Sequence, residues 1–119
     1  MSAQHTDPGG PLIPRPERGP AALRIALAQV APHRLPEMEQ QKDEAIALAA
    51  RTDSLGPIVQ FLESWAVVIE IARFPAVAAR LRSAEYAAQV LDREDPAWQT
   101  AMEEIRTVYL RARESLAHE

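Results

Sequence analysis

The chain has 119 residues, no cysteine, 5% aromatic residues and a formal net charge of −4 at pH 7. This length fits one domain of ordinary size, and the lack of cysteine excludes disulfide scaffolds, thiolate zinc sites and cysteine nucleophiles. The negative balance argues against a dedicated nucleic-acid binder, because neutralising phosphates drives that binding. The sequence has neither the roughly 18-residue apolar run that spans a bilayer nor a secretory signal, so we expect a cytoplasmic protein without membrane contact.

Residues 1–19 are expected to form a disordered leader. Four prolines and three glycines in this segment remove hydrogen-bond donors and interrupt regular structure. One P-x-x-P match, from Pro11 to Pro14, supports an alternative in which the leader binds an aromatic groove as a polyproline helix. Residues 20–119 are predicted to form a single helical domain.

Proline positions and helical periodicity divide that domain into five predicted helices. Proline suits the first turn of a helix, where its missing N–H costs nothing, and it stops a helix that precedes it. The expected helices cover about 21–30, 35–51, 57–73, 75–92 and 96–116. Because no run alternates with the period of two that a strand requires, we predict an all-α fold, a compact bundle of four to five helices.

The predicted helix at 57–73 is the most apolar element and is expected at the centre of the bundle. Val67, Ile71 and Phe74 fall on the side away from its main apolar face, so a second apolar strip is expected to stay exposed and bind a partner. The main face follows the i, i+3, i+4, i+7 spacing of a helix and comprises Ile58, Phe61, Leu62, Trp65, Val68, Ile69 and Ala72.

The last predicted helix carries a narrow apolar seam. Steps of four and three residues are typical of a helix that packs along one partner, as in a short coiled coil. The sequence leaves open whether that partner is in the same chain or in another. The seam comprises Trp98, Met102, Ile105, Tyr109, Ala112 and Leu116.

Two glutamates are the candidate catalytic or metal-binding residues. Glu63 and Glu70 lie two turns apart on nearly the same helical face, and paired carboxylates can bind a metal or transfer protons. The sequence lacks the Glu-x-x-His pairs of a di-metal bundle, a glycine-rich phosphate loop and a Gly-x-Ser-x-Gly turn. We therefore predict no enzyme activity and no cofactor, and we keep a metal-dependent enzyme as the least favoured alternative.

Arginines gather around the fourth predicted helix. Arg73, Arg80 and Arg82 are candidate contacts for an anion or a nucleic acid, although ordinary surface arginines would give the same pattern. The junctions near Pro32 and Pro75 lack the three- to four-residue turn, often with glycine, of a helix-turn-helix. For these reasons a dimeric DNA-binding transcriptional regulator is kept as the alternative function and not as the leading one.

Four motifs follow the proline-rich leader: A-A-L-R-x-A-L at 21–27, D-S-L-x-P at 53–57, F-L-x-x-W at 61–65 and R-x-P-A-x-A-A-R-L at 73–81. In these motifs the chain resembles a family of small actinobacterial proteins with no assigned function. The resemblance covers roughly residues 20–85 and implies no catalytic residue. It also implies toxin–antitoxin genes near some members.

The leading hypothesis is a non-catalytic helical protein-interaction module, antitoxin-like or regulatory. Its expected partner is another protein or a second copy of the chain. No small-molecule substrate is evident in the sequence.

Overall fold

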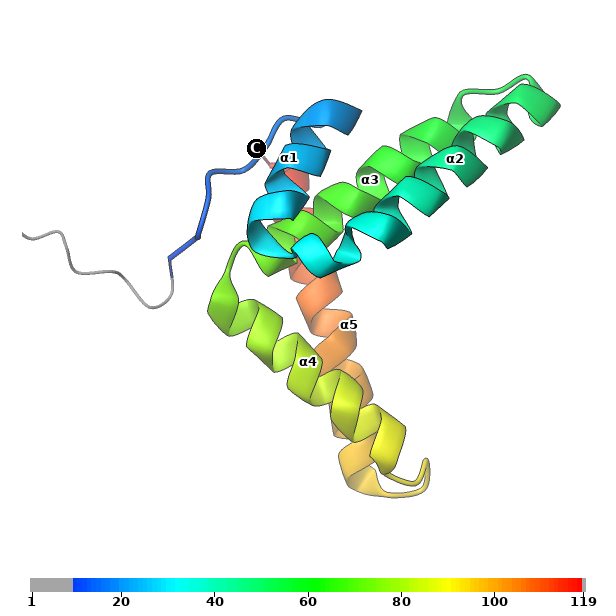
Figure 1. Cartoon of the computed structure of the whole chain (residues 1–119). Coiled ribbons are helices and arrows are strands. Elements are labelled where there is room, and N and C mark those ends of the chain that lie inside the picture. The colour runs from blue at the N-terminus through cyan, green and yellow to red at the C-terminus, as the bar shows by residue number, and fades with distance from the viewer. Residues whose placement is uncertain (1–9, 119) are drawn as a thin grey trace, which may run out of the picture. The chain divides into compact units, whose positions relative to one another are not determined.

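The computed structural model describes residues 10–118, and within that range the chain is all-α, with no strand (Figure 1). The predicted fold class is confirmed, and every predicted helix is present with nearly the expected bounds. The part of the predicted leader at 1–9 lies outside the described residues. The elements are α1 (Pro20–Val30), the 3₁₀ helix η2 (Pro32–Arg34), α2 (Leu35–Thr52), α3 (Gly56–Ala72), α4 (Pro75–Val90) and α5 (Pro96–Ala117).

The chain divides into two compact units. One unit is Ile13–Glu70, which holds α1, η2, α2 and most of α3. The other, within the described residues, joins 10–12 to 71–118 and holds α4 and α5. Each unit therefore contains one pair of long helices, α2 with α3 or α4 with α5.

Local chemistry explains where the helices begin and end. Every α-helix has a proline as its first or second residue, where no intrahelical N–H bond is lost. Asp95 caps α5, because its carboxylate accepts a hydrogen bond from the Ala97 N–H at 2.9 Å. Asp53 ends α2 in the left-handed conformation, at φ 52° and ψ 46°, which aspartate tolerates better than most residues. Nearby residues thus set the helix boundaries.

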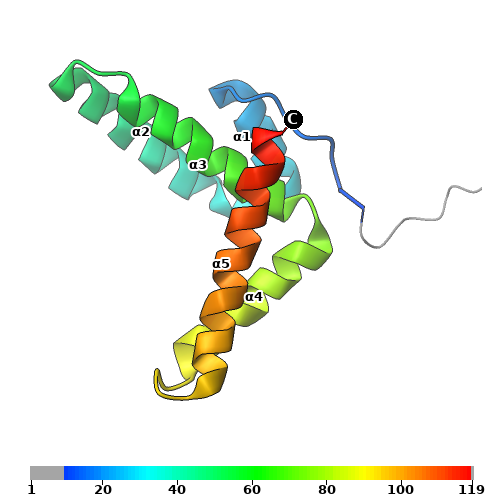
Figure 2. The same ribbon diagram turned by 180° about the vertical axis from the view of Figure 1, so that it is seen from behind.

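The first unit buries apolar side chains from α1, α2 and α3. Leu27 on α1 and Met38 on α2 are 0% and 2% exposed, and Trp65 on α3 is 1% exposed. The Trp65 indole N–H donates to Oε1 of Gln41 on α2 at 2.9 Å, which satisfies a polar group that burial would otherwise leave unpaired. Figures 1 and 2 both show α2 and α3 side by side. The predicted core position of Trp65 is confirmed.

The segment before α1 has irregular backbone and specific contacts. Arg15 donates from Nε and Nη2 to the two carboxylate oxygens of Glu70, at 3.0 and 2.9 Å. Glu70 is buried in the last turn of α3, where the helix dipole disfavours a negative charge, and the Arg15 charge offsets that cost. The Leu12 N–H also donates to the Arg73 carbonyl at 2.7 Å. Residues 10–18 thus lack helix and strand but make specific contacts, whereas a disordered leader was expected over residues 1–19.

Candidate protein-interaction surface

Helices α4 and α5 form an antiparallel hairpin with alanine at its contact face. Ala84 on α4 and Ala101 on α5 are 7% and 6% exposed, and both views show the two helices side by side (Figures 1 and 2). Small side chains permit a short distance between helix axes. The Trp98 indole N–H donates to the Ala88 carbonyl at 3.1 Å. The start of α5 therefore packs on α4 of the same chain.

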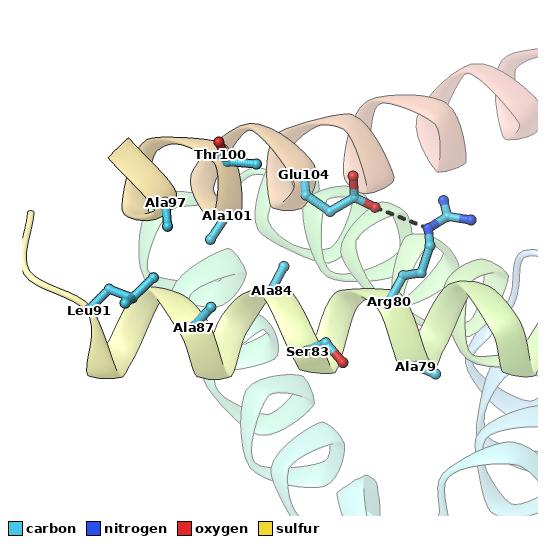
Figure 3. Close-up of a pocket in the computed structure, with 10 residues that line it drawn as sticks. All are labelled: Ala79, Arg80, Ser83, Ala84, Ala87, Leu91, Ala97, Thr100, Ala101 and Glu104. Atoms are coloured by element: carbon cyan, nitrogen blue, oxygen red, sulfur yellow. Dashed lines mark hydrogen bonds and ion pairs between the residues drawn. The ribbon is translucent and has the colours of Figure 1, made fainter. Parts of the chain in front are cut away.

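An open groove of about 620 Å³ runs along this hairpin (Figure 3). In Figure 3, Ala84 and Ala87 point from α4 toward α5, and Ala97 and Ala101 point back toward α4. The remaining lining is small or apolar apart from one charged pair. The groove is therefore a shallow, largely apolar trough. Its other lining residues are Ala79, Ser83, Leu91, Thr100, Arg80 and Glu104.

One ion pair crosses the groove near one end. Arg80 on α4 donates from Nε to Oε2 of Glu104 on α5 at 3.0 Å, and the two side chains are 52% and 39% exposed. An exposed pair of this kind contributes at most about 1 kcal/mol to stability. The groove thus carries one positive and one negative charge, on opposite helices.

Exposed apolar side chains continue the groove along α4. Tyr86 and Val90 are 66% and 58% exposed. They follow Ser83 by three and seven residues, so they share its helical face. A strip of large exposed apolar side chains is typical of a surface that another molecule covers. The groove and this flank together form one candidate surface.

The expected second strip on α3 is not an exposed surface. Val67 and Ile71 are 8% and 5% exposed, so both are buried. Phe74 is half-buried, and the Arg73 guanidinium lies over its ring at 4.6 Å. The expectation failed because α3 buries most of its circumference near its C-terminal end, so the apolar residues off its main stripe also belong to the core.

The predicted seam of α5 is displaced around the helix. Ala101, Val108 and Ala112 are the buried residues of α5, and Val108 is 2% exposed. The buried face of α5 therefore lies beside the face that carries the larger apolar side chains of the predicted seam. The four seam residues proposed as partner contacts are all half-buried: Trp98, Met102, Ile105 and Tyr109.

The three candidate anion-binding arginines do not share one surface. Arg73 is 8% exposed, and Arg80 pairs with Glu104. Arg82 is exposed but follows Arg80 by two residues, which places it on another side of α4. Binding a phosphate backbone requires several cations on one face. This arrangement gives the DNA-binding alternative little support.

The two candidate metal ligands also differ in environment. Glu63 is exposed on α3, while Glu70 is buried and holds Arg15. Seven residues separate them, which is about 10 Å along a helix axis. Within residues 10–118, no group of three or more histidine, aspartate or glutamate side chains is placed to hold a metal ion. The structure therefore does not bring Glu63 and Glu70 together as a pair of ligands.

A smaller apolar cluster lies at the turn between α2 and α3. Leu55 in the turn is 73% exposed, and Val59 one turn later is 50% exposed. Ile46 on α2 is 51% exposed, because α2 is buried near its start, at Met38, and not along its later turns.

The sequence contained a signal for the groove that hydrophobic periodicity does not detect. Ala79, Ser83 and Ala87 recur every fourth residue on α4, and Ala97 and Ala101 do so on α5. Residues four apart share a helical face, so each helix has a smooth stripe. Alanine also favours helix in any context, which hides such a stripe among ordinary helix formers.

Comparisons of the chain with protein-family models, with curated proteins and with solved structures find no match. In the part of the chain that the structure describes, no helix combines the length and apolar character needed to cross a bilayer.

Proposed function

We propose that this chain is a non-catalytic protein-interaction module whose docking surface is the α4–α5 groove. The proposal is carried by the open trough of about 620 Å³ and its exposed flank at Tyr86 and Val90. Half of the lining residues are alanines, which supply no acid, base or nucleophile, and the one carboxylate, on Glu104, is paired with Arg80. A trough between two antiparallel helices has the shape that receives an amphipathic helix.

A docked helix would stabilise the hairpin by covering apolar surface. In a hairpin of two helices, each helix keeps its outer face in water. A third or fourth helix covers these faces and completes a core. Burying the exposed parts of Tyr86 and Val90 would contribute roughly 1–2 kcal/mol each. The alanine floor lets the incoming backbone approach closely, which adds dispersion contacts.

An antitoxin-like or regulatory role in the cytoplasm is the specific form of this proposal that the family resemblance supports. In that form, the product of a neighbouring gene binds this chain. Co-expression of the two genes tests it, because a cognate partner should co-purify at a fixed stoichiometry. The DNA-binding and metal-enzyme alternatives have weaker support, since Arg73 and Glu70 are both buried.

Site-specific photo-crosslinking in the native cell tests the docking surface. A benzophenone side chain at position 83 lines the groove, and the same side chain at position 85 provides the matched control. Glu85 is exposed and follows Ser83 by two residues, which at 100° per residue places it nearly opposite the groove on α4. We expect a protein adduct from position 83 and none from position 85. Equal adducts from both positions, or none from either, would contradict the proposal.

A further inference from the structure

The charged pair of the groove is complementary to itself. Arg80 and Glu104 lie near the same end of the hairpin, on opposite helices. Two hairpins that face each other can be related by a two-fold axis that runs between them, parallel to the helices. This rotation places α4 of one copy opposite α5 of the other, and it does not shift any residue along the helix direction. Arg80 of one copy then faces Glu104 of the second copy, and the reverse. The four charges alternate in sign around the assembly, so each gains a second opposite neighbour.

The same rotation matches the helices in direction and size. Because α4 and α5 are antiparallel, each α4 also lies antiparallel to the α5 of the second copy, which is the arrangement of an antiparallel four-helix bundle. The 16 residues of α4 span about 24 Å, and two helices side by side are about 20 Å wide. Each copy would cover about 500 Å², and together they reach the roughly 1,000 Å² that a specific interface needs.

The charge balance of the groove favours this occupant over others. Its lining carries one cation and one anion, so it presents no net charge to attract a nucleic acid or a strongly charged protein. In the facing arrangement, a second copy places its anion opposite the cation of the first copy and its cation opposite the anion. The exposed Tyr86 and Val90 widen the apolar area on the flank of each copy.

We propose, on the basis of the proposed function, that the groove binds a second copy of this chain. Two α4–α5 hairpins then form an intermolecular four-helix bundle, in which Arg80 of each copy pairs with Glu104 of the other. Each copy contributes one of the two cations and one of the two anions. The bundle core is then formed by the alanines of both hairpins.

Charge reversal and mixing test this pairing. The Arg80→Glu variant brings four carboxylates together in a dimer, and Glu104→Arg brings four cations together. Like charges facing each other should raise the dimer dissociation constant about 100-fold or more. An equimolar mixture restores opposite charges across the interface, so the two variants should form a heterodimer. Glu85→Arg, an exposed reversal that follows Ser83 by two residues and so lies on the other side of α4, is the control and should leave the dimer intact.

Light scattering after size exclusion measures the result. The native chain should elute at twice its mass of 13.2 kDa, each reversal as a monomer, and the mixture again at twice the mass. Ser83→Arg, which fills the groove from an exposed position, keeps both charges and should also give a folded monomer. Circular dichroism confirms that each variant is folded.

Two outcomes would overturn the inference. One is a native chain that stays monomeric at high micromolar concentration, and the other is a dimer that the Ser83→Arg and Arg80→Glu variants leave intact. Position 83 crosslinked to a different protein would reject the second copy as occupant while the proposed function stands. The absence of any adduct at position 83 would reject the proposed function as well.

Discussion

Replacing Arg15 by alanine tests how firmly the segment before α1 is held. In the native protein Arg15 makes two hydrogen bonds to Glu70, whose side chain is 6% exposed. Removing one partner of a buried ion pair typically costs about 3–5 kcal/mol, because the other charge stays buried. Arg15 itself is 22% exposed, so water screens part of the interaction. We expect Arg15→Ala to lower the free energy of unfolding by about 2–3 kcal/mol.

Urea denaturation followed by far-ultraviolet circular dichroism measures this loss through the linear dependence of the free energy on urea. Arg15→Lys keeps the charge and loses the two parallel hydrogen bonds, so we expect a smaller loss, about 1 kcal/mol. The double variant Arg15→Ala with Glu70→Leu removes both charges and should recover most of the lost stability. Arg51→Ala, at an exposed position on α2, is the control and should change stability by less than about 0.5 kcal/mol.

The stability loss of Arg15→Ala is compared with that of the control, Arg51→Ala. If Arg15→Ala and Arg51→Ala lose the same small amount of stability, the pair with Glu70 does not hold residues 10–18 in solution. A double variant no more stable than Arg15→Ala would show that the buried charge of Glu70 is not the source of the cost.

Three further predictions concern single interactions. Trp65→Phe removes the indole donor to Gln41 and should cost about 1–2 kcal/mol in urea denaturation; no loss would mean that the bond is absent. Asp95→Ala removes the cap of α5 and should cost about 1 kcal/mol, which thermal unfolding would detect as a lowered Tm. The Arg24 hydrogen bond is the main cause that holds the pKa of Glu39 below its ordinary 4.5. Since the folded pKa is the lower one, the contribution is present above pH 4.5 and is lost as the pH falls through the folded pKa. NMR titration should therefore show the Glu39 pKa rising toward 4.5 in Arg24→Ala, and an unchanged pKa would refute the pairing.

Helix positions could be predicted from the sequence because local residues set them. A proline lies in the first turn of each α-helix, and Asp95 caps α5 through its own neighbour Ala97. Such signals act within a few residues, so they are visible without the fold. The burial of Trp65 was predictable for a similar reason, since its apolar neighbours recur with the helical period.

The surface could not be predicted in the same way, because exposure depends on residues far away in the sequence. Ile46 and Val67 have the same apolar chemistry, yet Ile46 is 51% exposed and Val67 is 8% exposed. What covers each position is decided by packing between elements. The pair of Arg15 with Glu70 joins residues 55 positions apart, and no local pattern marks either residue as a partner of the other.

The placement of the two tryptophans gives each unit a natural spectroscopic probe. Trp65 lies in the unit Ile13–Glu70, and Trp98 lies in the unit that contains α4 and α5. In a variant that keeps one indole, intrinsic fluorescence reports the melting of one unit at a time. Coincident transitions in the two single-tryptophan variants would show all-or-none unfolding, and separate transitions would show that the units melt independently.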